Sequence, residues 1–92
     1  MAAWRVELTP AAARELRKAS SDERVALRGV ILALASDRHP LGARKLTARS
    51  LWRVRLRIDG AAWRVVYQVR NRDHLVVVTR VVRRDEGTYR RL

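Results

Sequence analysis

The sequence predicts an α+β fold in which an antiparallel sheet carries an αα-hairpin on one face. Three observations lead to this fold class. Apolar side chains recur with helical spacing in the first half of the 92-residue chain, and they alternate as in strands from Leu51 onward. The dipeptide Asp59-Gly60 favours a tight turn between two strands. The expected order of elements is β-α-α-β-β-β, and the length fits a single domain over residues 1–92.

The first 18 residues predict a short strand followed by a helix. Residues 4–8 alternate between apolar and charged side chains, which is typical of a half-buried strand. Thr9 is a good N-cap, and Pro10 suits the first helical position because a proline there sacrifices no helical hydrogen bond. We expect this helix to run to about Lys18.

The second helix begins at a capping box, in which Ser20 and Glu23 satisfy each other's backbone N–H groups. Its apolar residues are spaced i, i+3, i+4 and i+7, which predicts one buried face. These residues are Leu27, Val30, Ile31 and Leu34. The helix must end before Pro40, and we expect residues 37–49 to form a loop.

Three further strands are predicted after the loop. They span residues 51–58, about 62–70 and 74–83. The Asp59-Gly60 turn joins the first two strands, and residues 71–73 turn the chain into the third. The third strand is apolar on both faces, so we expect it in the middle of the sheet.

Composition limits the function classes. The chain has 21 Lys and Arg against 9 Asp and Glu, a net charge of +12, yet 48% of its residues are apolar, so it is not a disordered basic tail. The absence of cysteine excludes disulfides, thiolate metal sites and cysteine catalysis. Residues 25–35 form the longest apolar run and contain Arg28, which excludes a membrane span. No signal peptide is recognisable, and we expect a small, soluble, cytoplasmic protein without contact to a membrane.

The excess charge predicts a polyanionic partner. Residues 1–46 carry nine basic and five acidic side chains, whereas residues 47–92 carry twelve and four. Only Lys18 and Lys45 are lysines, and arginine suits planar, bidentate contacts with phosphates or carboxylates. A nucleic acid, an acidic protein, or both in turn fit such a surface.

The strand at residues 51–58 places Arg53, Arg55 and Arg57 on one face. Side chains at i and i+2 lie about 6.6 Å apart, so two guanidiniums repel by about 0.6 kcal/mol in water and about 2.5 kcal/mol at an effective dielectric of 20. Either these arginines are the solvated side of an amphipathic strand, or an anion relieves their repulsion. Arg64 on the next strand and the pair at residues 83–84 favour a larger cluster.

Other residues offer less chemistry. Tyr89 in the tail either anchors the chain or stacks on an unpaired base. His39 and His74 are expected to be ordinary surface histidines, and the tryptophans to be packing residues. The acidic residues of the C-terminal half are dispersed without metal-ligand spacing, and no glycine-rich phosphate loop is present. We therefore expect neither a metal nor a cofactor.

Three segments together resemble the RelE/ParE superfamily of toxins from bacterial type II toxin–antitoxin systems. They read Leu-Trp-Arg-Val-Arg-Leu-Arg at 51–57, Trp-Arg-Val-Val-Tyr-Gln-Val at 63–69 and Val-Val-Arg-Arg-Asp at 81–85, followed by Tyr89. The resemblance covers nearly the whole chain, and the RelE branch is closer than the ParE branch. RelE-like toxins are ribosome-dependent endoribonucleases that cut mRNA in the ribosomal A site, so the resemblance implies an mRNA interferase.

The resemblance also implies roles for individual residues. Arg53 and Arg55 match two basic residues that assist deprotonation of the 2′-OH and hold phosphate. Arg64 matches the arginine that stabilises the transition state, and Arg84 the one that protonates the leaving group. Tyr89 matches a tyrosine that stacks on the target base.

Further contacts follow from the same resemblance. RNA contacts are expected from Lys45, Arg57, Arg83 and Arg90. The resemblance also implies an acidic antitoxin that neutralises the basic surface within a hetero-oligomeric toxin–antitoxin complex.

One departure from the family pattern leaves the activity open. The best-known branch has lysines where this chain has Arg53 and Arg55. Arginine does not deprotonate in proteins, so these residues are poor general bases and better electrostatic clamps. Slow or strongly ribosome-dependent cleavage and loss of cleavage are both compatible with this change. The alternatives are a ParE-like toxin that inhibits DNA gyrase by binding, and an inactive basic module that an antitoxin neutralises.

Overall fold

The computed structural model describes residues 4–46 and 50–84, and it confirms the α+β fold. Within these residues two helices accompany a five-stranded sheet. The helices are α1 (Pro10–Lys18) and α2 (Ser21–Ala33). The strands are β1 (Arg5–Leu8), β2 (Arg44–Lys45), β3 (Leu51–Ile58), β4 (Ala61–Arg70) and β5 (Leu75–Arg84).

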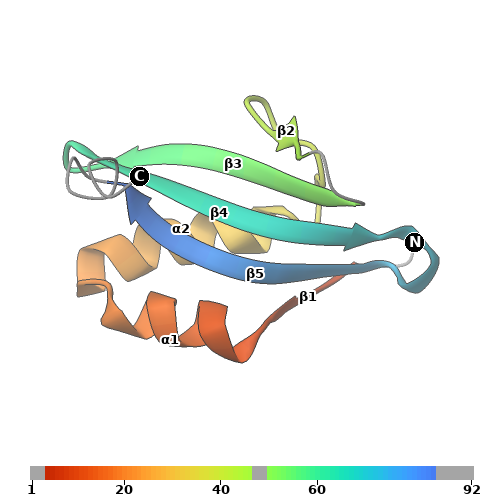
Figure 1. The fold of residues 1–92 in the computed structure, drawn as a ribbon, viewed down its shortest axis with the longest axis horizontal. Coiled ribbons are helices and arrows are strands. Elements are labelled where there is room, and N and C mark those ends of the chain that lie inside the picture. The colour runs from red at the N-terminus through yellow and green to blue at the C-terminus, as the bar shows by residue number, and fades with distance from the viewer. Residues whose placement is uncertain (1–3, 47–49, 85–92) are drawn as a thin grey trace.

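The strands lie in the order β1-β5-β4-β3-β2 (Figure 1). The meander β3-β4-β5 is antiparallel, as predicted. The expectation of a wholly antiparallel sheet is wrong, because β1 pairs with β5 in parallel over residues 5–8 and 75–78. The two helices between β1 and the meander allow the chain to return in the same direction, and nothing in the local sequence of β1 specifies its partner.

The sequence predicted a continuous loop over residues 37–49, but residues 44–45 within it form the short strand β2. Arg44 pairs with Arg53 and Lys45 with Trp52 in an antiparallel bridge to β3. Two residues are too few to show strand alternation, so their pairing depends on the exposed edge of β3 rather than on a local pattern.

The helix starts are those that the sequence predicts. Thr9 Oγ1 accepts the N–H of Ala12 at 3.2 Å. Ser20 Oγ accepts the N–H of Glu23 at 3.2 Å, while Glu23 Oε1 accepts the N–H of Ser20 at 2.9 Å. These caps satisfy N–H groups that a helix leaves without partners in its first turn. They fix where each helix starts relative to the sheet.

The core lies between the helices and one face of the sheet (Figure 1). Leu27 and Ile31 of α2 and Leu34, the residue after its last turn, are buried, and Val30 packs against them partly exposed. The sheet contributes buried residues from three strands, namely Val54, Ile58, Trp63, Val65, Tyr67, Val69, Val76, Val78 and Val81. We call this side of the sheet the helix face and the other side the open face.

The β3–β4 turn has the conformation that its sequence predicts. Asp59 (φ 49°) and Gly60 (φ 83°) both have positive φ values, as a two-residue type I′ turn requires. This turn fixes the register of β3 against β4, and with it the positions of the arginines on the open face. No helix among the described residues is long and apolar enough to cross a membrane.

Candidate functional site: an arginine cluster on the open face

The register of the meander brings arginines from three strands onto the open face. Arg55 on β3 lies directly opposite Arg64 on β4. Arg84 on β5 lies opposite Ala62, two residues before Arg64 and therefore on the same face. Arg53 lies opposite Val66, which places it on that face as well. Directly opposite side chains have Cβ atoms about 5 Å apart, and i, i+2 neighbours about 7 Å.

Arg44 on β2 extends this group at the sheet edge. It pairs with Arg53, so both side chains lie on the open face. We call the five residues Arg44, Arg53, Arg55, Arg64 and Arg84 the arginine cluster. The sequence had nominated four of them for catalysis or phosphate contact, and the fold brings these four together.

Burial and electrostatic repulsion within the cluster both lower the pKa values of Arg53 and Arg84. Burial lowers the pKa of Arg53 from its usual value, and repulsion from Arg55, Arg64, Arg44 and Arg84 lowers it further. Burial likewise lowers the pKa of Arg84, together with repulsion from Arg64 and Arg55. Arginine side chains in proteins are cations at neutral pH. The cluster is therefore a preformed concentration of positive charge.

Acidic side chains do not neutralise most of this charge. In the part of the chain that the structure describes, Arg44, Arg53, Arg55 and Arg64 form no salt bridge. Arg64 Nε is buried and has no hydrogen-bond partner among the described residues. A buried donor without an acceptor is costly, and a bound anion with several oxygens would satisfy it. The cluster thus has the charge and the donors of an anion site.

Arg57 lies beside the cluster on the open face. It follows Arg55 by two residues and lies opposite Ala62, which in turn lies opposite Arg84. Its Nη1 donates to the carbonyl of Gly60 in the adjacent turn at 3.4 Å. This weak contact leaves most of the guanidinium donors available, so an RNA contact by Arg57 stays a prediction.

Lys45 and Arg83 do not join the cluster. Lys45 lies opposite Trp52 and Arg83 opposite Trp63, and both tryptophans face the helices. The expectation that Arg83 joins the cluster together with Arg84 is therefore wrong, whereas RNA contacts by Lys45 and Arg83 stay predictions. The cause is strand alternation: neighbours of Arg44 and Arg84 in sequence point to the opposite side of the sheet. Tyr89 and Arg90 lie outside the described residues.

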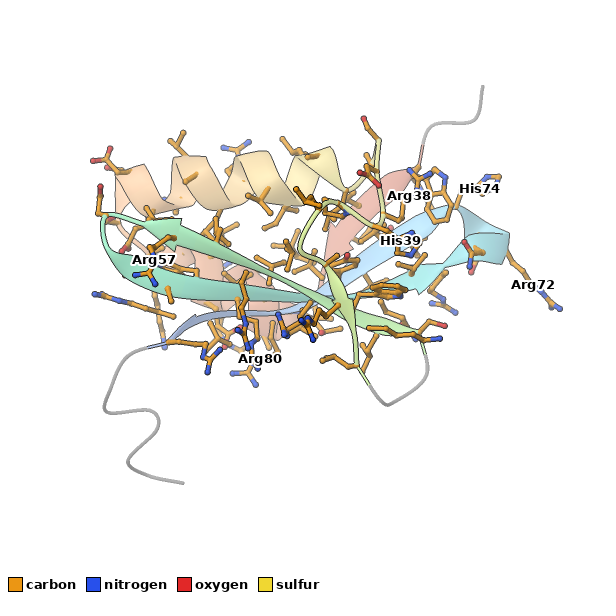
Figure 2. The ribbon with its side chains drawn as sticks, turned by 90° about the horizontal axis from the view of Figure 1, so that it is seen from above. Arg38, His39, Arg57, Arg72, His74 and Arg80 are labelled. Atoms are coloured by element: carbon orange, nitrogen blue, oxygen red, sulfur yellow. The ribbon has the colours of Figure 1, made fainter. Side chains whose placement is uncertain are left out.

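Sequence reasoning missed Arg44 and Arg80 at this site. Arg80 lies opposite Val66 but forms a salt bridge with Glu15 of α1, with Nη2 and Oε2 2.7 Å apart. In Figure 2 it lies on the side of the sheet away from α2. No sequence signal could have shown that pair, since its residues are 65 positions apart.

The histidines do not lie with the arginines of the open face, because their rings contact tryptophans that pack on the helix face. Figure 2 shows His39 and His74 near Arg38, far from Arg57. The His39 ring contacts Trp52 at a centroid distance of 4.2 Å, and the His74 ring contacts Trp4 at 5.2 Å. Both histidines are exposed, as expected, and Trp63 is a core residue. These residues therefore stabilise the fold, and the chemistry of the site falls to the arginines.

Comparison with known proteins agrees with this fold. The sequence profile of the ParE toxin of the type II toxin–antitoxin system parDE matches residues 6–87. The chain therefore belongs to this toxin family, within the RelE/ParE superfamily that its sequence resembles. It is a toxin of a type II toxin–antitoxin system. No protein of curated function matches the chain.

Solved structures of RelE proteins share the fold. The chain is 22% identical to a protein in the intact RelBE toxin–antitoxin complex of E. coli, with a TM-score of 0.76, covering 92% of this chain and 100% of that one. For the RelBE2 complex of Mycobacterium tuberculosis the identity is 22% and the TM-score 0.75, covering 91% and 94%. For the archaeal RelE–RelB complex of Pyrococcus horikoshii the values are 17% and 0.71, covering 92% and 99%.

Proposed function

We propose that the protein is an endoribonuclease that cuts mRNA on the ribosome, with the arginine cluster as its catalytic centre. The observation that carries this proposal is the convergence of Arg55, Arg64 and Arg84 on one face, with Arg53 beside them. The fold shared with RelE toxins supports it. Arginines from three strands thus share one face, where they can contact the same phosphodiester linkage.

The chemistry that suits these residues is cleavage by the substrate itself. The 2′ oxygen attacks the adjacent phosphorus, the bond to the 5′ oxygen breaks, and a 2′,3′-cyclic phosphate and a 5′-hydroxyl result. Arg53 and Arg55 hold the phosphate and orient the 2′-OH, whose proton passes to water. Arg64 stabilises the negative charge that develops on the phosphoryl oxygens. Arg84 donates to the departing 5′ oxygen, which completes its protonation from water.

Arginines limit the cleavage rate of such a centre because none of them can act as a general base. A lysine can lose its proton and act as a base, whereas an arginine cannot. Positioning and electrostatic stabilisation remain, and each supplies several kcal/mol of a typical enzymatic rate enhancement. The ribosome would therefore have to contribute by holding the mRNA in a kinked conformation, and free RNA should be cut poorly.

An acidic antitoxin is the partner that this surface favours. Relatives in the solved structures form toxin–antitoxin complexes. An acidic segment over the arginine cluster would quench its charge and block access to RNA. We place both the cleavage and this hetero-oligomeric complex in the cytoplasm, where ribosomes are found.

Primer extension on mRNA in programmed ribosomes tests the proposal. The wild-type protein should produce discrete breaks at the A-site codon, and Arg64→Ala should reduce their rate by 100-fold or more, since one transition-state donor is lost. Arg72→Ala is the matched control, because Arg72 is exposed near the β4–β5 turn, away from the cluster (Figure 2). Absence of breaks with ribosome binding intact would overturn the proposal.

The match to the ParE profile favours a second candidate, inhibition of DNA gyrase by binding. In this case the arginine cluster contacts an acidic surface or DNA without catalysis. A supercoiling assay separates the two candidates. Inhibition of gyrase that survives both Arg64→Ala and Arg84→Ala, with no cleavage of ribosomal mRNA, would favour the second.

A further inference from the structure

The alternation of side chains between the two faces of the sheet is interrupted halfway along β5. Val76 and Val78 are fully buried on the helix face, and the next buried residue is Val81, three positions on. The pairing with β4 shows why: Tyr67 lies opposite Val78 and Val66 opposite Arg80, so Thr79 is an extra residue. This β-bulge shifts every following side chain to the other face.

The bulge decides which arginine joins the cluster. With uninterrupted alternation from Val76 and Val78, Arg84 would face the helices and Arg83 the open face. With the extra residue, Arg84 lies opposite Ala62 on the open face. The position of Arg84 in the arginine cluster thus depends on how the segment Arg80–Arg84 is held.

The bulge lies where β5 loses its second neighbour. Strand β1 pairs with β5 only as far as Val78, and α1 continues along the same edge (Figure 1). The N–H of Thr9 donates to the carbonyl of Val78 at 2.9 Å, and Thr9 Oγ1 donates to the carbonyl of Thr79 at 3.1 Å. Thr79 Oγ1 donates in turn to the carbonyl of Val66 at 3.3 Å.

Glu15 of α1 makes the next contact along this edge. Its Oε1 accepts the backbone N–H of Val81 at 2.7 Å. Its carboxylate also accepts from Arg80 Nε and Nη2, with Oε2 at 3.0 and 2.7 Å. In the bulged strand the N–H of Val81 points to the open edge, where no strand is available to pair with it. Glu15 therefore supplies the hydrogen-bond acceptor for the Val81 N–H that a neighbouring strand would otherwise supply at this edge.

We propose that Glu15 is a positioning residue for Arg84: by accepting from the Val81 N–H it holds the re-phased segment Arg80–Arg84 against β4 and keeps Arg84 in the arginine cluster. Glu15 lies on a different element from every cluster residue, and within residues 4–46 and 50–84 its side-chain hydrogen bonds and its ion pair are with Arg80 and Val81. The consequence for cleavage rests on the proposed function, whereas the effect on the strand does not.

Amide hydrogen exchange followed by NMR tests the structural step. Glu15→Leu removes the acceptor, and we expect exchange at Val81, Val82 and Arg84 to rise tenfold or more relative to residues 75–78 in the same spectra. Glu15→Gln keeps an acceptor oxygen and should raise the exchange rates of these amides less than threefold. Glu7→Gln is the control, since Glu7 is an exposed acid on β1. An equal rise along all of β5, or no rise, would overturn the proposal.

A charge swap separates the strand contact from the ion pair. The double variant Glu15→Arg/Arg80→Glu restores opposite charges but places no acceptor on α1 for the Val81 N–H. We expect exchange as fast as in Glu15→Leu. Exchange at the wild-type rate would show that the ion pair alone positions the segment, and would contradict the role given to Val81.

A measurement without any variant covers the case in which Glu15→Leu fails to fold. The amide proton of Val81 in the wild-type protein should change its chemical shift as the Glu15 carboxylate is protonated, because that proton is hydrogen-bonded to the carboxylate. The amides of residues 75–78 should not follow this titration. A Val81 amide that does not follow it would overturn the proposal.

The functional step is tested by coupling to Arg84. We expect Glu15→Leu to reduce single-turnover cleavage about as much as Arg84→Ala, with substrate affinity changing less than threefold. The double variant should be no slower than Arg84→Ala alone. Full additivity would overturn the positioning role. If the wild type cuts no RNA while the exchange results hold, the proposed function fails and the structural role of Glu15 stands.

Discussion

Arg55 and Arg64 lie directly opposite one another on β3 and β4, so two like charges share the shortest cross-strand distance that a sheet allows. Such a pair destabilises the fold unless an anion lies between or above the two guanidiniums. Arg53 and Arg84 add to the repulsion: burial lowers their pKa values, and the neighbouring arginines lower them further. The protein therefore maintains a charge arrangement that favours binding over stability.

Neutralising one member of this pair should stabilise the free protein. We expect Arg55→Gln to raise the free energy of unfolding by up to about 1 kcal/mol at low ionic strength, because the pair is solvated and screened. The gain should shrink above about 0.5 M salt. Urea denaturation at two salt concentrations measures it, and Arg72→Gln is the control. A loss of stability at low salt would mean that Arg55 has a favourable partner.

RNA binding should show the salt dependence of several phosphate contacts. For single-stranded RNA, log Kd rises with log salt concentration by about 0.7 per neutralised phosphate. If the five cluster arginines each neutralise one phosphate, the slope is about 3.5, and Arg64→Ala should lower it by about 0.7. Fluorescence anisotropy with a labelled oligonucleotide gives the slope. A slope that Arg64→Ala leaves unchanged would exclude phosphate contact by Arg64.

Tyr67 should make stability fall in alkaline solution. Its hydroxyl donates to the carbonyl of Arg38 at 2.8 Å, and burial, with repulsion from Asp37, raises its pKa from 10.0 to about 12. Since the unfolded chain loses this proton near pH 10 and the folded chain only near pH 12, the stabilisation is complete below pH 10 and declines between these values. Tyr67→Phe should cost about 1 kcal/mol at neutral pH.

Unfolding curves of wild type and Tyr67→Phe at several pH values check this assignment. The difference between the two proteins should narrow as the pH rises above 10, because only the wild type loses the contribution of Tyr67. A constant difference up to pH 11.5 would contradict the assignment.

Glu15 should make stability fall in acid. Burial tends to raise the pKa of its carboxyl, but hydrogen bonds from Arg80 and Val81 and attraction to Arg80 and Lys18 outweigh it, so the pKa lies below 4.5. The folded state thus favours the charged form, and this stabilisation is present above pH 4.5 and declines as the pH falls through the folded value. Because Arg80 is half-exposed, the contribution of the charged Glu15 to the free energy of unfolding is less than about 1 kcal/mol.

Comparison with Glu15→Gln isolates this contribution. The stability difference between wild type and variant should be constant from pH 5 to 7 and decrease below pH 4.5. A difference that grows in acid would mean that the fold favours the neutral carboxyl.

Much of this architecture follows from local sequence signals. Thr9, the Ser20–Glu23 capping box and Asp59-Gly60 each act within four residues, so the helix starts and the hairpin could be predicted. The alternation in residues 51–58 also gave the face of Arg53 and Arg55. The sequence did not assign the register of this strand against the next one, so the pairing of Arg55 with Arg64 is known only from the structure.

The missed features depend on contacts between distant residues. The parallel pairing of β1 with β5 joins segments about 70 positions apart, and β2 is too short to carry a pattern. The bulge at Thr79 reversed the phase of β5, so the faces of Arg83 and Arg84 could not be assigned by counting. The contact that stabilises the bulged strand joins Glu15 to Val81, which are 66 positions apart in the sequence.

Pulse labelling of cells after induction of the toxin tests the central claim most directly, because it asks which polymer the arginine cluster acts on. The account predicts that incorporation of labelled methionine stops within minutes, while incorporation of thymidine continues, and that Arg64→Ala restores methionine incorporation but Arg72→Ala does not. Arrest of thymidine incorporation first, with Arg64→Ala still toxic, would contradict a ribonuclease centre at the cluster.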